Sequence, residues 1–319
     1  MTDPNAAAAP DPSRVIPTRP LGTTGERVSL LGVGGAHLGK PDEAVAIRMV
    51  HEAIDAGATF MDNAWEYNDG ESEIRMGKAL GQGGYRDRAF VMTKDCAHDR
   101  RADHALRLLE ESLRRLQTDH LDLWQIHEVV WDDDPEKIFA PGGSAEAMLK
   151  AKEQGKVRFI GFTGHKHPDL HRQMLSHGFP WDTAQMPINP LDPHYLSFLK
   201  DIVPLCQEQG IAVLAMKSLA GGHLLKRGTG VEPAEALRFA MSQPVATVIS
   251  GMDSPEILRA NLATARDFVP MSNAEQADLL ARTAPAAPGG PFETFKSTRD
   301  FDGTEGRKAH HYPLQGAAD

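Results

Sequence analysis

The feature that most constrains the fold is a repeated alternation of short apolar segments with amphipathic helical patterns. Eight runs rich in β-branched and other apolar residues recur along the chain, and each is followed by a helical or helix-compatible segment. Repeated strand–helix units are typical of a parallel sheet, and eight of them favour a closed barrel over an open sheet. We therefore predict a (β/α)8 TIM barrel. Its strands are expected at residues 29–35, 59–64, 89–94, 121–127, 157–163, 183–188, 211–217 and 246–252.

The segment before the first strand predicts a small addition to this barrel. Residues 19–29 (RPLGTTGERVS) have the pattern of a β-hairpin with Thr24-Gly25 at its turn. An open dinucleotide-binding sheet would instead carry G-x-G-x-x-G after its first strand and an acidic residue about 20 residues later. The chain has GVGGAHLG at 32–39 without that acidic residue in the right context. The Gly-rich loop alone is therefore weak evidence for an open sheet.

The length of 319 residues is compatible with one large domain or two small ones, and the eight repeated units favour one. We expect a flexible N-terminal tail over residues 1–18, because that stretch is rich in Ala, Pro and Asp. A single barrel domain is expected over 19–285. Residues 286–319, rich in Pro, Gly and charge, are expected to form a C-terminal loop or tail.

The charge balance and the cysteine content exclude several classes of protein. There are 34 Lys and Arg residues against 44 Asp and Glu residues, a formal net charge of −10, which argues against a dedicated nucleic-acid binder. No apolar run approaches the roughly 18 residues of a transmembrane helix, so we expect no membrane partner. Two cysteines, Cys96 and Cys206, cannot build a disulfide framework. A cytoplasmic location is therefore expected.

Four residues that can carry chemistry stand at or just beyond the ends of three successive predicted strands. Asp62 ends the second strand, with Tyr67 in the following loop, Lys94 ends the third, and His127 ends the fourth. The active sites of such barrels lie at the carboxyl ends of the strands, so these side chains should converge. A lysine ammonium can lower the pKa of a tyrosine phenol, and a carboxylate can hold that lysine. Proton delivery to an oxygen could then accompany hydride transfer.

Each of these residues also has an ordinary structural interpretation. A Lys or Asp at a strand end is more often part of a rim salt bridge, a loop tyrosine usually packs, and a histidine can be a satisfied core residue. The four together, each placed near a strand end, are far less expected by accident. The combination therefore favours a catalytic site.

Three segments resemble the catalytic segments of the aldo-keto reductase family. They are FMDNAWEYNDGESEIRMGKAL at 60–80, FVMTK at 90–94 and LDLWQIH at 121–127, and the resemblance extends from about Arg19 to Ala265. The family implies an eight-stranded α/β barrel, an NAD(P)H cofactor and the reduction of aldehydes or ketones, or the reverse reaction. Its substrate would be a small-molecule carbonyl or alcohol.

The resemblance also implies a role for each of the four residues. Tyr67 would be the general acid, Lys94 would lower its pKa, Asp62 would hold the lysine, and His127 would orient the carbonyl. The loop after Tyr67 reads Asn-Asp-Gly-Glu-Ser-Glu and is two residues longer than in many members. The mouth beside the proton donor is therefore expected to have a different shape.

A dinucleotide site at the ends of the later strands is a further implication of the resemblance. Gln185 matches the glutamine that contacts the nicotinamide amide, whereas Thr163-Gly164 replaces a Ser-Asn pair, and residues 215–225 resemble the pyrophosphate loop. Gly251 stands at one of the positions where many members have a basic residue for the 2′-phosphate, so family use favours NADP(H) and leaves NAD(H) open. The expected cofactor-binding residues are Thr163, Gln185, Lys217, Ser218, Leu219, Gly221, Gly251 and Asn261.

Two other functions fit parts of the sequence. The first is a nucleotide-sensing regulatory barrel with little or no turnover. The second is a metal-dependent hydrolase built on His165, His167 and His171, but the strand-to-helix loop there leaves their geometry unset. We assign no metal to the catalytic site, because hydride transfer needs none. The native substrate, the direction of the reaction and the oligomeric state are not determined by the sequence.

Overall fold

Eight parallel strands close into a barrel in the computed structural model, which describes residues 15–226 and 229–314. The strands follow one another around the barrel in chain order, and the last, β10, pairs with the first, β3. This arrangement confirms the predicted (β/α)8 architecture. The strands are β3 (Leu31–Gly34), β4 (Phe60–Asp62), β5 (Phe90–Lys94), β6 (Leu121–Ile126), β7 (Val157–Thr163), β8 (Thr183–Pro187), β9 (Ala212–Met216) and β10 (Thr247–Gly251).

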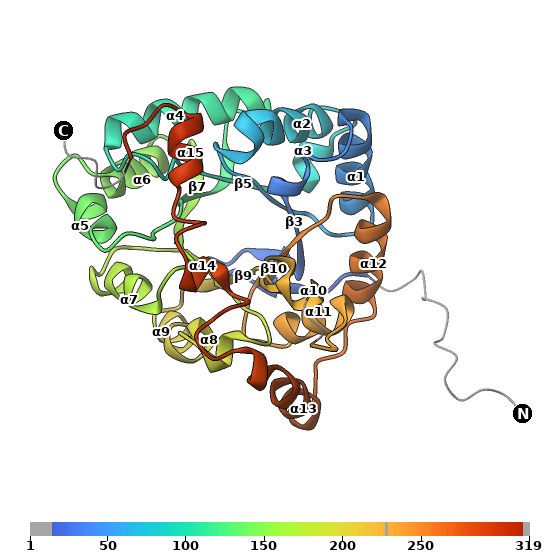
Figure 1. Ribbon diagram of the computed structural model, residues 1–319. Helices are drawn as coiled ribbons and strands as arrows, with labels where there is room; N and C mark the ends of the chain where they lie inside the picture. The colour runs from blue at the N-terminus through green and yellow to red at the C-terminus, as the bar shows by residue number, and fades with distance from the viewer. Residues whose placement is uncertain (1–14, 227–228, 315–319) are drawn as a thin grey trace, which may run out of the picture.

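Helices form the outer layer of the barrel (Figure 1). In α4, Leu109, Leu113 and Leu116 are buried, as their spacing of three to four residues predicts. This helix ends where Gln117 takes a left-handed conformation. The helices of this layer are α1 (Glu43–Asp55), α2 (Glu71–Leu80), α3 (Tyr85–Arg88), α4 (Ala102–Leu116), α5 (Asp134–Phe139), α6 (Ser144–Glu153), α7 (Pro168–Ser176), α8 (Phe198–Asp201), α9 (Val203–Glu208), α10 (His223–Lys226), α11 (Pro233–Met241), α12 (Pro255–Arg266) and α13 (Asn273–Thr283).

The two-residue period of the strands determines which side chains enter the barrel. Phe60, Met92 and Leu123 belong to one buried apolar cluster in the lower part of the barrel. Two residues further along β4 and β5, the same alternation points Asp62 and Lys94 to the same side as Phe60 and Met92. The alternation along these strands thus places apolar side chains in the lower part of the barrel and polar side chains, such as Asp62 and Lys94, at the carboxyl ends of the strands.

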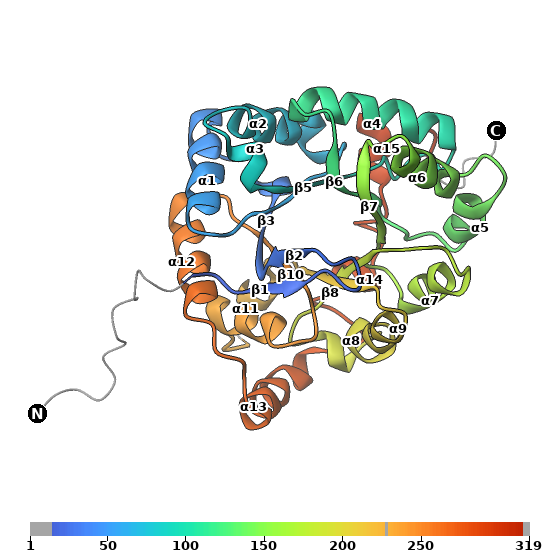
Figure 2. The same ribbon diagram turned by 180° about the vertical axis from the view of Figure 1, so that it is seen from behind.

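The N-terminal hairpin closes the bottom of the barrel (Figure 2). Its strands, β1 (Thr18–Pro20) and β2 (Arg27–Ser29), pair antiparallel, and Gly25 at the turn has a φ of 82°. Leu21 and Val28 are buried in the same cluster as the barrel interior. The hairpin therefore contributes apolar side chains to the core, and its prediction is confirmed.

The C-terminal part of the chain crosses the opposite end of the barrel (Figure 1). It contains the short helices α14 (Thr294–Ser297) and α15 (Thr304–Ala309). A buried ion-pair cluster fastens it: Lys296 Nζ lies 2.8 Å from Asp192 Oδ1 and 2.9 Å from Glu293 Oε2. Of the tail expected over 1–18, residues 1–14 lie outside the described residues. The domain boundaries at 19 and 285 stay predictions.

Among the described residues, no helix has both the length and the apolar character needed to cross a membrane.

Candidate active site

A buried lysine lies at the centre of the polar layer at the carboxyl ends of the strands. Lys94 Nζ donates hydrogen bonds to Asp62 Oδ2 and to the carbonyl oxygen of Asn63, both at 2.7 Å. It also lies 3.2 Å from the hydroxyl oxygen of Tyr67. Lys94 is 1% exposed, so these contacts replace the water that an ammonium group would otherwise bind. The structure thus brings together three of the four predicted catalytic residues.

The fourth predicted residue, His127, packs edge-on against the Tyr67 ring, with the ring centroids 5.6 Å apart. Its backbone N–H donates to Asp95 Oδ1 at 2.7 Å. Its Nδ1 lies 3.4 Å from Glu66 Oε1. Because Glu66 holds Nδ1, the other ring nitrogen is available on the opposite edge of the imidazole. Glu66 was not singled out from the sequence; only its position next to Tyr67 could have suggested it.

The electrostatics of the site keep the proton on the tyrosine. Burial raises the pKa of Tyr67 well above its usual value, and the carboxylates of Asp62, Glu128 and Glu66 add to that rise. Lys94 contacts the hydroxyl as expected, but the net shift in the pKa of Tyr67 is upward because desolvation dominates. Burial also lowers the pKa of Lys94, while Asp62 acts in the opposite direction. The phenol is therefore neutral and carries a proton to donate.

The loop that presents Tyr67 has an unusual backbone. Asn68, Asp69 and Gly70 have φ values of 54°, 54° and 88°, three left-handed residues in succession. Asn, Asp and Gly are the residues that tolerate this conformation best. The side chain of Asn68 donates to the carbonyl oxygen of Ala36 at 3.1 Å, which ties the loop to the end of β3. The extra length seen in the sequence is thus used for a compact turn next to the hydroxyl.

The predicted cofactor-binding residues lie on the other half of the rim, at the carboxyl ends of β7 to β10 and in α12. Gln185 reaches across the barrel, and its Nε2 lies 3.4 Å from Asp62 Oδ2. Its Oε1 is buried, and no group among the described residues donates a hydrogen bond to it. Asn261 Nδ2 donates to Ser250 Oγ at 3.0 Å. Thr163 and Ser218 are buried, whereas Leu219 is half-buried and Gly221 and Gly251 are exposed.

The loop after β9 has a strained backbone. Lys217, Ala220, Gly221 and Gly222 all have positive φ, between 49° and 87°. Two of them are not glycine, and such strain in a loop at the mouth of a barrel is typical of binding sites. A hydrogen bond of 2.8 Å from the backbone N–H of Ala220 to the carbonyl oxygen of Lys217 closes a turn within this loop.

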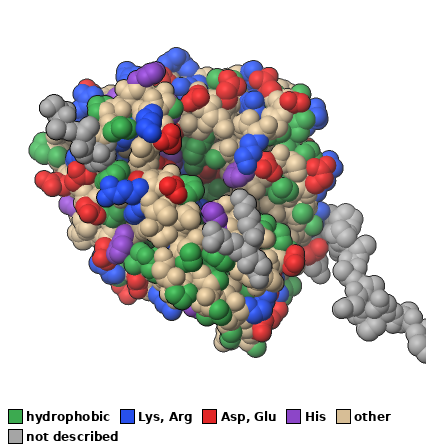
Figure 3. Space-filling model, in the orientation of Figure 1, with side chains coloured by type: hydrophobic (Ala, Val, Ile, Leu, Met, Phe, Trp, Pro, Cys, Tyr) green, Lys and Arg blue, Asp and Glu red, His purple; other side chains and the backbone are tan. Residues whose placement is uncertain are grey.

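The C-terminal segment covers part of this half of the rim. Lys217 Nζ lies over the rings of Phe295 and Phe301, 5.4 and 5.9 Å from their centroids. The carbonyl oxygen of Phe301 lies 3.1 Å from His165 Nε2. Figure 3 shows this face of the molecule, with histidine and charged side chains around a central hollow. The rings of Phe295 and Phe301 therefore lie against Lys217, the lysine that we expect to bind the phosphates of the cofactor.

Two residues of the loop after β3 were not predicted but lie beside the expected adenosine site. His37 packs so closely on Gly251 that a Cβ at that glycine would lie 2.2 Å from the imidazole. Lys40 Nζ lies 3.1 Å from Asp253 Oδ2 in the loop after β10. Sequence patterns gave no signal for either contact, because 213 residues separate Lys40 from Asp253.

The three histidines considered as metal ligands are directed to separate partners. His165 Nε2 lies against Phe301, His167 Nδ1 accepts the Asp169 N–H at the start of α7, and His171 Nε2 lies 3.3 Å from the Gln185 carbonyl. In residues 15–226 and 229–314, these histidines do not bring their ring nitrogens together as a ligand group.

The sequence model of the Aldo/keto reductase family matches residues 30–235. This chain belongs to that family. Aldo-keto reductase YhdN of Bacillus subtilis (strain 168) is 30% identical in an alignment of 228 positions that covers 66% of this chain and 64% of YhdN. The matched part therefore spans less than two thirds of that relative. L-galactose dehydrogenase of Arabidopsis thaliana is 30% identical over 227 residues, 67% of this chain and 68% of that protein.

A solved structure supports the same assignment. The holo form of aldo-keto reductase AKR11C1 from Bacillus halodurans superposes with a TM-score of 0.70 at 26% identity. The superposition covers 84% of this chain and 96% of that one. Family membership and the closed barrel with its hairpin thus rest on independent observations.

Proposed function

We propose that this protein is an NAD(P)H-dependent oxidoreductase that reduces an aldehyde or ketone to an alcohol, or catalyses the reverse reaction, with Tyr67 as the general acid. The observation that carries the proposal is the position of Lys94 Nζ between Asp62 and Tyr67, at 2.7 and 3.2 Å. A neutral phenol, a lysine facing its oxygen and a histidine beside its ring can together deliver a proton to a carbonyl oxygen. We infer a cytoplasmic setting from the two free thiols.

In this proposal some residues orient the carbonyl group and others transfer one proton. His127, held at Nδ1 by Glu66, offers its other nitrogen to the carbonyl oxygen. Tyr67 then gives its hydroxyl proton to that oxygen as the carbonyl carbon becomes tetrahedral. Lys94 stabilises the phenolate that remains, because its Nζ already faces the phenolic oxygen. Asp62 keeps the lysine in place throughout.

The second half of the rim fits a nicotinamide cofactor. Gln185 Oε1 is buried without a partner and can accept an N–H from a carboxamide, while Nε2 of the same side chain stays near Asp62. When bound, NADPH or NADH supplies the hydride that the carbonyl carbon receives. Lys217, Ser218, Leu219 and Gly221 would hold the pyrophosphate, with Thr163 and Gly251 at the neighbouring strand ends and Asn261 on α12.

We favour NADP(H) over NAD(H), although one basic residue near the adenosine site is already engaged. Arg259 on α12 is paired with Glu52 of α1, with Nε 2.7 Å from Oε1. Lys40 is likewise paired, with Asp253 Oδ2 at 3.1 Å, and its 58% exposed side chain lies at the mouth between β3 and β10, where it can meet a 2′-phosphate. A comparison of KM for NADPH and NADH in the native protein decides this preference.

The proposal is tested by following NADPH and NADH absorbance with a panel of aldehydes, ketones and sugars. Sugars belong in the panel because one relative is named L-galactose dehydrogenase. Tyr67→Phe should lower kcat by about 10²- to 10⁴-fold, because it removes the proton donor and keeps the ring. The dissociation constant for NADPH, measured by fluorescence, should remain close to the native value.

Unchanged turnover in Tyr67→Phe would contradict the assignment of the general acid. A native protein that binds NADPH but oxidises it with no carbonyl compound would instead favour the nucleotide-sensing alternative. Tyr85→Phe is a matched control, because that tyrosine lies on the outer layer and its hydroxyl contacts Asp55 Oδ2 at 2.9 Å.

A further inference from the structure

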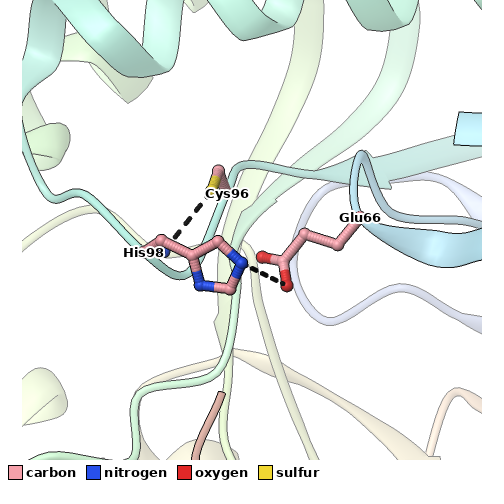
Figure 4. Close-up of side chains that lie close together, drawn as sticks. All are labelled: Glu66, Cys96 and His98. Carbon is pink, nitrogen blue, oxygen red and sulfur yellow. Dashed lines mark hydrogen bonds and ion pairs between the residues drawn. The ribbon is translucent and has the colours of Figure 1, made fainter. Parts of the chain in front are cut away.

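A carboxylate, a thiol and an imidazole lie together on the rim (Figure 4). They adjoin the proposed catalytic residues through the contact of Glu66 with His127, but they are not among them. Glu66 comes from the loop after β4, and Cys96 and His98 come from the loop after β5. One potential ligand atom from each residue lies within 4.8 Å of the other two. In the part of the chain that the structure describes, this is the one group of three or more such side chains that comes together in this way.

A second histidine reaches the same place from the C-terminal segment. His310 Nδ1 lies 3.1 Å from His98 Nε2, although 212 residues separate them along the chain. The other nitrogen of His310, Nε2, lies 3.3 Å from Asp69 Oδ1. A histidine that binds a metal commonly donates its second ring N–H to a carboxylate, which fixes the tautomer and the ring. His310 is therefore oriented as such a ligand would be.

Two of the distances between these donors are close to those of a tetrahedral site, and the Cys96 sulfur lies within 4.8 Å of the Glu66 and His98 ligand atoms. Bond lengths of about 2.0–2.1 Å for Zn–N and 2.3 Å for Zn–S imply donors roughly 3.3–3.6 Å apart. The His98 Nε2 to Glu66 Oε2 distance is 3.4 Å. The His98 to His310 distance is 3.1 Å. One sulfur, two imidazole nitrogens and one carboxylate oxygen form a donor set that suits Zn²⁺.

We propose that Glu66, Cys96, His98 and His310 bind one Zn²⁺. His98 Nε2 has a single proton or lone pair, yet it faces both Glu66 Oε2 and His310 Nδ1, at 3.4 and 3.1 Å, so these two neighbours compete for one hydrogen bond. His98 Nδ1 is also buried without a partner. A metal ion bound to Nε2 would resolve this conflict, since both neighbours could bind it at the same time. The thiol of Cys96 would release its proton to solvent on binding.

A glycine in α15 allows this helix to approach the cluster closely. A Cβ at Gly306 of α15 would lie 2.9 Å from His98 Cε1 and 3.0 Å from Nε2. Glycine at this position therefore permits the approach that brings His310 to His98. The backbone N–H of His98 donates to Cys96 Sγ at 3.4 Å and helps to fix the sulfur, although burial and the Glu66 carboxylate raise the pKa of the thiol above its usual value. Four protein ligands leave no open position, as in structural zinc sites.

A zinc ion at this site would join the C-terminal segment to two loops of the active-site rim. Glu66 Oε2 would bind the metal and Oε1 would remain 3.4 Å from His127 Nδ1. The ion would therefore hold the carboxylate that positions His127. It would act as a structural staple next to the reaction centre and would take no part in proton or hydride transfer.

The experiment measures metal binding by the full-length protein. The protein is produced with added zinc, dialysed and analysed for metal content, then stripped with a chelator and titrated with Zn²⁺ and with Co²⁺. We expect one Zn²⁺ for each chain, and a near-ultraviolet thiolate-to-Co²⁺ charge-transfer band. Cys96→Ser should lose this band, whereas Cys206→Ser, which removes the other buried thiol, should keep it. His310→Ala should weaken Zn²⁺ binding by at least about tenfold.

The proposal is overturned if the native protein shows no saturable Zn²⁺ binding, or if Cys96→Ser and His310→Ala bind the metals as the native protein does. His310→Ala keeps the test valid should Cys96→Ser fail to fold, because His310 lies at the end of a short surface helix. A Co²⁺ spectrum without the thiolate band in the native protein would also contradict the assignment of Cys96. These readouts do not depend on turnover, so the zinc site can fail while the proposed function stands.

Discussion

Two buried lysines of this protein make three hydrogen bonds each, yet they are suited to different tasks. Lys94 donates to a carboxylate, a carbonyl oxygen and the hydroxyl of Tyr67. Lys296 donates to the carboxylates of Asp192 and Glu293 and to a carbonyl oxygen. Both ammonium groups are thus compensated, but only one of them faces an oxygen that can gain and lose a proton.

The difference shows how one residue type can serve either stability or chemistry. The carboxylates of Asp192 and Glu293 carry more negative charge than the one positive charge of Lys296, and the cluster fixes the C-terminal segment to the barrel. A single carboxylate holds Lys94, and the remaining position is taken by the phenol of Tyr67, which we propose as the proton donor. A buried lysine with one titratable, reactive neighbour is therefore a better candidate for a catalytic group than one surrounded by carboxylates.

The largest effect on turnover is expected from Lys94→Met. In the proposed mechanism this substitution removes the charge that stabilises the phenolate, so kcat should fall by at least about 10²-fold. Stability should also fall, because Asp62 is left buried without its partner. Turnover is therefore measured per folded molecule, with the folded fraction taken from circular dichroism. Lys137→Met, at a half-exposed lysine of α5, is the matched control. A kcat within a few-fold of the native value would remove Lys94 from the mechanism.

Lys296→Met should affect stability far more than turnover. It leaves Asp192 and Glu293 as buried carboxylates without a cation, a change that typically costs about 3–5 kcal/mol of unfolding free energy. Equilibrium unfolding in urea, followed by tryptophan fluorescence, measures this loss. The kcat of the folded fraction should decrease much less than in Lys94→Met. A loss of stability below about 1 kcal/mol would show that the cluster does not fasten the segment.

The fold could be predicted from the sequence because its signals are local. The alternation of strands and helices is read within windows of a few residues, and strand ends such as Asp62, Lys94 and His127 fall on one rim by topology alone. The structure confirms the barrel and places these three side chains at that rim. Tyr67 was found in the same way, since it follows a strand end by five residues.

Contacts between distant segments could not be predicted in this way. The approach of His310 to His98, the rings of Phe295 and Phe301 over Lys217, and the Lys40–Asp253 pair depend on how loops and the C-terminal segment cross the rim. No periodic pattern encodes such crossings. The net pKa shift of Tyr67 also required the structure, because it depends first on the depth of burial and then on which carboxylates lie near the hydroxyl.

Asp95 extends the comparison to a buried carboxylate that no lysine contacts. Its Oδ1 accepts the His127 N–H at 2.7 Å, and its Oδ2 has no hydrogen-bond partner. Burial raises the pKa of Asp95 to about 7, although Arg100 and the hydrogen bond oppose that rise. In the unfolded chain the pKa of an aspartate is about 3.9. Between these two values the folded state holds more protons than the unfolded state, so stability should fall as the pH rises from about 4 to 7.

Asp95→Asn should therefore reduce this loss of stability with pH. The amide oxygen can still accept the His127 N–H, and no charge has to be buried above pH 7. Each pKa unit corresponds to about 1.4 kcal/mol, so the substitution should gain at most a few kcal/mol at pH 8 and little at pH 4.5. Urea unfolding of both proteins at the two pH values measures the difference. A gain of the same size at pH 4.5 and pH 8 would mean that Asp95 is ionised in the folded state at both, and that Arg100 compensates its charge as fully as a lysine would.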